Sequence, residues 1–302
     1  MRLLLAISAC LTLSSPSAGA QPRARAPEFT DDDRAAFFGD AFDALVGERP
    51  EAAAALTQPP AAPSGGEAEA VDWAGIVATD VLETEIKRQA AALGDATRSA
   101  TRFKAGGYRD AVDALSMLAT LFAVVDEHGG SPRWRDAAAG LRELFAEAAA
   151  QAGAATDSAH EAASARQRNM ADLIRGSRPA VPAPGRGPVD WSLLASRNTL
   201  MRRMEAAERG RLTPLMADDA AFRRGADEVR HEAQLLALLA QAILRPEAAD
   251  HADPGYQRFA RRLRQASTAL AAAAEAEDRG AATRAMTEVS RSCVDCHADF
   301  RG

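Results

Sequence analysis

From residue 71 to the C-terminus, hydrophobic residues recur every three or four positions, the pattern of amphipathic helices. The same order of four helical patterns occurs twice. In the second half we expect helices over residues 190–209 and 219–244, a third starting near Pro254 and a fourth after Gly280. In the first half we expect helices over residues 72–93 and 108–126, one from Pro132 and one over 156–175.

Short sequence matches indicate that the two halves are an internal repeat. Val71-Asp72-Trp73 recurs as Val189-Asp190-Trp191, and Ala171-Asp172-Leu173-Ile174-Arg175-Gly176 is similar to Ala298-Asp299-Phe300-Arg301-Gly302. Short-looped amphipathic helices in sets of four are typical of four-helix bundles. The pattern therefore predicts an all-α fold with two tandem up-down-up-down bundles, over residues 71–176 and 189–302.

Residues 1–20 have the features of a signal peptide for export. Arg2 is followed by a mostly apolar run from Leu3 to Leu13, and Ala18-Gly19-Ala20 is a small-residue cleavage site. We expect a mature start near Gln21 and a periplasmic protein. An alternative is a lipid anchor at Cys10, because Ile7-Ser8-Ala9-Cys10 resembles a lipobox, although the preceding apolar run is short.

The remaining segments link these parts. Residues 21–70 begin with an expected short helix capped at Thr30 and end in a flexible Pro- and Gly-rich linker. Residues 177–188 form a second Pro-rich linker. No later stretch is long and apolar enough to span a bilayer. The net charge of −6, with both signs interspersed, does not favour nucleic acid or an acidic membrane surface as a partner.

The strongest chemical signal is Cys293-Val294-Asp295-Cys296-His297, near the end of the last expected helix. Cys-x-x-Cys-His is the attachment signature of c-type haem. Residues three and four apart share a helix face, so both thiols can face one porphyrin edge while His297 reaches the iron. The alternatives are a disulfide between the two cysteines or a degenerate motif without a cofactor.

The cysteine count supports haem over a zinc site. The chain has three cysteines, and removal of the leader with Cys10 would leave only the two in the motif. We therefore expect one covalent haem c per chain, with the motif on the core-facing stripe of the last helix. Arg166, Asn169 and Met170 stand at the matching positions of the first half, which cannot attach haem. Its interior would be filled by side chains such as Met170, Leu173 and Ile174.

The second half resembles the cytochrome c′ family, in which the haem motif lies near the end of the last helix of a four-helix bundle. The matching segments are Arg197-Asn198-Thr199-Leu200-Met201, Gly210-Arg211-Leu212-Thr213-Pro214 and the segment from Cys293 to Arg301. The first half resembles the family only as a degenerate copy. The tandem arrangement departs from the single bundle that is usual in the family.

The resemblance implies a role for each matching residue. Cys293 and Cys296 would hold the haem by thioethers, and His297 would be the proximal iron ligand. Arg301 would lie near the proximal face and Arg197 near a haem propionate. Met201 would point at the distal face, as sixth iron ligand or only as a shield. The first-half counterparts of Arg197 and Met201 are Thr79 and Glu83, while His231 is the histidine to check as a rival ligand.

Three functions follow from these alternatives. Electron transfer with an unknown redox partner is favoured, because a Met at the distal position permits a low-spin His–Met site. A five-coordinate iron would instead bind NO or CO, and a third possibility is a haem-stapled interaction scaffold. We assign no catalytic residue and expect no enzymatic activity. Because cytochromes c′ often dimerise through their first two helices, the haem-less half could form an intrachain pseudo-dimer with the other.

Overall fold

The computed structural model describes residues 30–31, 71–181, 189–248 and 250–300. The chain divides into two compact units, Met1–Ala68 and Glu69–Gly302. Of the first unit only Thr30 and Asp31 are described, and helical structure includes Asp31. The expected signal peptide, nearly all of the segment 21–70 and part of the linker 177–188 lie outside the described residues.

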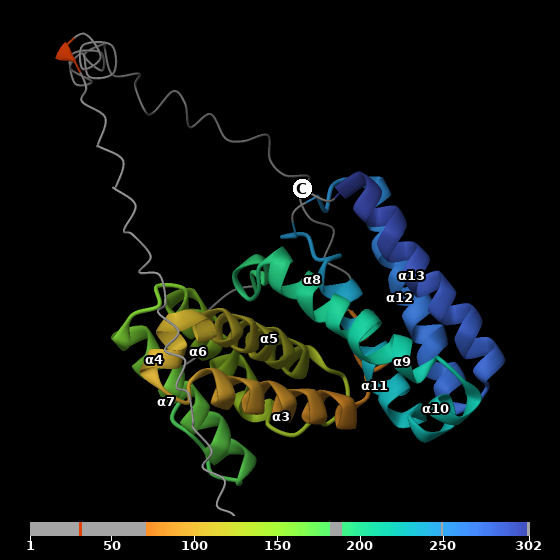
Figure 1. The fold of residues 1–302 in the computed structure, drawn as a ribbon. Coiled ribbons are helices and arrows are strands. Elements are labelled where there is room, and N and C mark those ends of the chain that lie inside the picture. The colour runs from red at the N-terminus through yellow and green to blue at the C-terminus, as the bar shows by residue number, and fades with distance from the viewer. Residues whose placement is uncertain (1–29, 32–70, 182–188, 249, 301–302) are drawn as a thin grey trace, which may run out of the picture. The chain divides into compact units, whose positions relative to one another are not determined.

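The first helical group contains the long helices α3 (Thr79–Ala96), α5 (Tyr108–Glu127), α6 (Arg135–Ala152) and α7 (Asp157–Ile174). A short helix α4 (Ala100–Arg102) and a π-helical turn (Phe103–Gly107) lead into α5. In Figure 1 these helices lie side by side, with α5 packed against α6 and α3, and α7 packed against α6 and α3.

The second helical group contains the longer helices α8 (Arg197–Glu205), α11 (Ala226–Ala242), α12 (Pro254–Glu275) and α13 (Arg279–Phe300). Its short elements are a 3-10 turn (Trp191–Leu193), a π-helical turn (Ala206–Leu212), α9 (Thr213–Leu215) and α10 (Asp219–Arg224). α12 packs along α11 and α13 (Figure 1). The described residues contain no strand, so the all-α expectation is confirmed.

Side-chain caps explain where several of these helices begin. The hydroxyl of Thr156 accepts the Ala159 amide at the start of α7, and the hydroxyl of Ser196 accepts the Thr199 amide at the start of α8. At α12, Asp253 caps the helix and Pro254 occupies its first turn. The expected starts at residue 156 and Pro254 agree with these caps.

Three other expected boundaries were wrong. α8 begins at Arg197, not at residue 190, because the Asp190 carboxylate caps the 3-10 turn through the Ser192 amide. Gly210 does not end this helical segment, which continues through Leu212 as a π-helical turn. The helix expected over 219–244 is interrupted at Gly225, which separates α10 from α11.

The first helical group has two corrections of the same kind. α3 begins at Thr79 instead of residue 72, and the amide of Ala78 donates to the Gln234 side chain at 2.8 Å. α6 begins at Arg135 instead of Pro132, because Trp134 has a left-handed backbone with φ of 71°. A residue in that conformation cannot continue a right-handed helix.

The interior of the first helical group is filled by its own side chains. Phe122 and Phe145 stack at 5.7 Å between ring centroids. Met170 is fully buried and Leu173 is 3% exposed, while Ile174 is partly buried against the core. These three residues therefore have the filling role expected of them.

Two tryptophans join the two helical groups. The rings of Trp73 and Trp191 stack with centroids 5.5 Å apart and planes 21° apart. The Arg245 guanidinium lies 4.4 Å from the Trp191 ring centroid and 5.7 Å from that of Trp73. Both Arg245 and the Trp73 indole donate to the carboxylate of Glu127. We call these four residues the tryptophan joint.

A search of the described helices found none with the length and apolar character needed to cross a membrane.

Candidate haem site

The Cys-x-x-Cys-His motif occupies the last turns of α13. Cys293 and Cys296 are half-buried free thiols, one helical turn apart on the side of α13 that packs on the core. Further back on the same helix, Met286 and Val289 are buried. The cysteines thus continue the buried stripe, as expected.

His297 departs from that expectation, because it is exposed. Each residue turns a helix by about 100°, so His297 is displaced from Cys296 around the axis and lies at the edge of the stripe. Val294, on the outer face, is 69% exposed. The imidazole therefore lies at the boundary between the protein interior and solvent, next to the inward-facing thiols.

Both thiols are held in the neutral form at neutral pH. Burial and the nearby Glu208 carboxylate raise the pKa of Cys293 to about 11. Burial also raises the pKa of Cys296, and the positive charge of Arg197 opposes this shift. Two of the charged residues that influence these pKa values, Arg197 and Glu208, belong to α8 and to the turn after it.

One face of the segment from α8 to the following turn lies toward α13. Arg197 interacts electrostatically with Cys296, and Glu208 accepts a hydrogen bond from Ser290 of α13 at 2.7 Å. Met201 and Met204 lie between Arg197 and Glu208 in the sequence. The successive spacings of the four residues are four, three and four, so all of them lie on one helix face. Met201 is half-buried and Met204 is 5% exposed. Met201 is thus on the same face as Arg197.

Arg197 has one partner in the loop that precedes α12 and another in the first turn of α12. Its guanidinium donates to the Asp250 carboxylate and lies 5.5 Å from the centroid of the Tyr256 ring. The hydrogen bond to Asp250 is the main cause of a raised pKa for Arg197. A permanent cation next to Cys296 suits the expected propionate contact. Arg301, the other arginine assigned to the site, lies outside the described residues.

Aromatic rings pack beside the end of α13. Phe300 meets Tyr256 edge-to-face at 5.4 Å and Phe259 at 6.3 Å between ring centroids. Tyr256, Asp250 and Glu208 were not assigned to the site from the sequence. Spacing along α8 could have indicated Glu208, whereas Asp250 in a loop gave no signal.

His231, the rival ligand, points elsewhere. Its Nε2 is 3.0 Å from Glu85 of α3, and Glu232 lies next to them, so the three side chains form a compact buried cluster. Ion pairs from three arginines, Arg88, Arg203 and Arg211, neutralise the acidic residues of this region. A metal ion there would meet that positive charge, and the cluster is explained as an ion-pair network.

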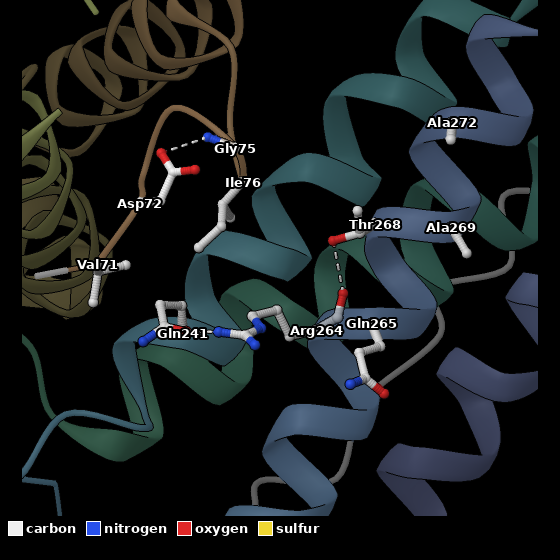
Figure 2. A pocket seen from close by; sticks show the side chains of 10 residues that line it. All are labelled: Val71, Asp72, Gly75, Ile76, Gln241, Arg264, Gln265, Thr268, Ala269 and Ala272. Atoms are coloured by element: carbon white, nitrogen blue, oxygen red, sulfur yellow. Dashed lines mark hydrogen bonds between the residues drawn. The ribbon is translucent and has the colours of Figure 1, made fainter. Parts of the chain in front are cut away.

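A groove outside this region is lined by residues of both helical groups. Figure 2 shows Val71, Asp72 and Ile76 on one side and Arg264 and Thr268 of α12 on the other. Arg264 donates to Gln241, and Asp72 accepts the Gly75 amide. The described residues that line the groove include none of the thiol, imidazole or thioether groups that bind haem iron.

A family model described as cytochrome c′ matches residues 251–301, which cover α12, α13 and the haem motif. The C-terminal region is thus similar to cytochrome c′. This match suggests a haem-binding c-type cytochrome with haem c as the implied cofactor. No curated protein and no solved structure gave a significant match.

The residues around the cytochrome c′ motif fit a haem. Two free thiols lie one turn apart on the inward side of α13, and an imidazole follows directly. Tyr256, Phe259 and Phe300 supply aromatic rings beside the end of α13, and α8 carries two methionines with thioether sulfurs. The donor set is that of c-type haem ligation.

Proposed function

We propose that this protein is an exported electron carrier with one covalently attached haem c. The observation that supports the proposal best is the pair of free, inward-facing thiols beside His297, in the region that matches cytochrome c′. Cys293 and Cys296 form the thioethers, and His297 is the proximal ligand. Arg197 is close to a haem propionate, and Arg301 lies near the proximal side.

Met201 is the sixth ligand in this proposal. It lies on the α8 face that carries Arg197 and Glu208, both of which reach α13. With haem bound, the Met201 thioether would close the iron to exogenous ligands and would raise its reduction potential. Such a site passes single electrons without binding a substrate, and therefore no enzymatic activity is assigned.

The first experiment is an absorption spectrum of the exported protein, oxidised and reduced, with and without carbon monoxide. We expect low-spin bands that carbon monoxide does not shift. Met201→Leu should open the site and give a high-spin spectrum that carbon monoxide shifts. Met204→Leu is the matched control, because it changes the same side chain one turn away and should leave the spectrum as it is.

Other outcomes would redirect the proposal. A wild-type spectrum that is high-spin and shifts with carbon monoxide would replace electron transfer by NO or CO binding at an open site. If Met204→Leu instead of Met201→Leu opened the site, the sixth ligand would be Met204. The absence of c-type haem would overturn the proposal altogether.

Export is part of the proposal because c-type haem is attached outside the cytoplasm. The N-terminal mass of the purified protein tests it. A start near Gln21 supports removal of a signal peptide, a lipidated Cys10 supports an anchored form, and an intact Met1 in a haem-loaded protein contradicts both.

We also propose that the haem-less first half takes the place of a partner subunit. The proposal is supported by contacts of α3 with α11 and of α5 with α8, and by the tryptophan joint. Sedimentation equilibrium should then give a monomer. A haem-loaded dimer would contradict this arrangement.

A further inference from the structure

α8 has a second face, which is bonded to the first helical group. The hydroxyl of Thr199 donates to Asp113 of α5 at 2.9 Å, and the Arg202 Nε donates to the same carboxylate at 2.8 Å. One residue further, the Arg203 Nε donates to Glu85 of α3 at 2.9 Å. Three neighbouring side chains of one short helix are therefore tied to two helices of the other group.

The contact between Arg203 and Glu85 is the most buried of these. Glu85 is 1% exposed and Arg203 is 8% exposed. The Glu85 carboxylate also meets the Nε2 of His231 at 3.0 Å and accepts from the Gln89 amide at 2.7 Å, while Arg203 also pairs with Glu232 at 2.8 Å. A buried ion pair adds little net stability, but a guanidinium held by two carboxylates has a fixed position.

This fixed face and the haem-side face are opposite each other. Residues two apart on a helix point about 200° apart, so Arg203 and Met201 lie on opposite sides of α8. Any shift or rotation of α8 that lengthens the Arg203–Glu85 contact therefore also moves Met201 and Arg197 relative to α13. The contacts on the fixed face therefore help to set the position of the haem-side face.

We infer that Glu85 of the haem-less half is a positioning residue that holds α8, through Arg203, at the distance from α13 at which Met201 faces the iron. Asp113 is the second anchor, through Thr199 and Arg202. The inference rests on the proposed function, because it takes Met201 as the distal residue. It gives the haem-less half an effect on the haem that is transmitted through α8.

The test is Glu85→Gln in the haem-loaded protein, read by its spectrum with and without carbon monoxide. Gln keeps the size of Glu but removes the charge that fixes Arg203. We expect the ratio of high-spin to low-spin protein to rise about 2- to 30-fold, which corresponds to about 0.5–2 kcal/mol of coupling, and carbon monoxide to shift the spectrum of the high-spin fraction.

Asp126→Asn is the matched control. It breaks the Arg142–Asp126 pair, in which Nη1 and Oδ2 are 2.8 Å apart and the Arg142 side chain is 8% exposed. That pair joins α5 to α6 within the first helical group and has no bond to α8. We expect the control to leave the haem spectrum unchanged, with and without carbon monoxide, even where it lowers stability.

Several outcomes would overturn the inference. An unchanged spectrum of haem-loaded Glu85→Gln, with and without carbon monoxide, would do so, and equal changes in Asp126→Asn would reduce the effect to general destabilisation. If Glu85→Gln does not fold, the haem spectrum of Arg203→Lys is measured instead, because Lys keeps the positive charge but cannot make the paired contacts of a guanidinium. An unchanged haem in Arg203→Lys would then count against the inference. A wild-type protein without haem c would refute the proposed function first, and the inference with it.

Discussion

The two helical groups differ most at the ends of their last helices. At the end of α7, Met170 and Leu173 are buried, and α3 packs along α7. At the end of α13 the inward positions are held by two half-buried thiols, and the α8 segment reaches α13 through Arg197 and Glu208. The end of the last helix is thus filled by apolar side chains in the first group. In the second group it carries residues suited to a prosthetic group.

This difference predicts where the stability of each group comes from. The first group buries its own large side chains and should fold on them alone. In the second group a covalent haem would supply apolar surface that the side chains near α13 do not. Substitutions in one helical group at a time therefore test this difference.

The largest effect is expected from Cys293→Ser combined with Cys296→Ser. Without thioethers the protein should lose all covalent haem c and the second helical group should loosen, while α3 to α7 stay folded. Haem staining after denaturing electrophoresis checks the first effect, and hydrogen exchange followed by mass spectrometry checks the second. Unchanged thermal unfolding and unchanged exchange in α8 to α13 would count against the difference between the groups.

Met170→Ala tests the other side of the comparison. Removing a fully buried methionine should lower the unfolding free energy by about 2–5 kcal/mol. The haem spectrum should stay the same, because Met170 packs within the first group. Urea denaturation measures the loss, with the exposed Arg168→Ala as the control, for which we expect a change within about 0.5 kcal/mol.

The contact between the groups should depend on pH. Burial alone would raise the pKa of Glu85, but the hydrogen bond from His231 and the charge of Arg203 outweigh it and hold the pKa well below the ordinary value of 4.5. A lowered carboxyl pKa stabilises the fold above the unfolded-state pKa, and this contribution is lost as the pH falls through the folded-state pKa.

We therefore expect the unfolding free energy to decrease as the pH is lowered below about 4.5, by up to about 1.4 kcal/mol per pH unit for this one proton. Urea titrations from pH 7 to pH 3 measure the slope. Glu85→Gln should have a shallower slope over the same range. Identical slopes for the two proteins would show that Glu85 does not carry this part of the acid sensitivity.

The smallest effect is expected on a side of α8 that faces neither partner. Glu205 pairs with Arg209 one turn later at 2.9 Å, and their side chains are 59% and 76% exposed. Exposed pairs of this kind contribute about 0.3–0.5 kcal/mol. Glu205→Gln should therefore leave both the haem spectrum and the melting temperature nearly unchanged. A large spectral change would mean that the contacts on the two bonded faces are not sufficient to fix the position of α8.

Local sequence signals predicted the parts of the fold that depend on neighbouring residues. Thr156 and Pro254 marked helix starts because capping and proline geometry are local effects. The haem motif was recognisable for the same reason, since its spacing is a property of one helix. The start of α8 was mispredicted because Asp190 and Ser196 are both good caps: Asp190 caps the 3-10 turn, and Ser196 caps α8.

The contacts that organise the site could not be predicted from the sequence. Asp250 lies 53 positions from Arg197, and Glu85 lies 118 positions from Arg203. Neither pairing follows from periodicity, because each depends on how two helices or a helix and a loop meet in space. For His297, the periodicity correctly placed the residue beside the inward-facing cysteines, but it did not predict that the side chain is exposed.

The tryptophan joint has an optical consequence. The chain has three tryptophans, and two of them stack on each other where the helical groups meet. Stacked indoles couple their excited states, so a near-ultraviolet circular dichroism couplet should accompany the intact contact and vanish if the groups separate. This couplet would therefore report whether the two helical groups are in contact.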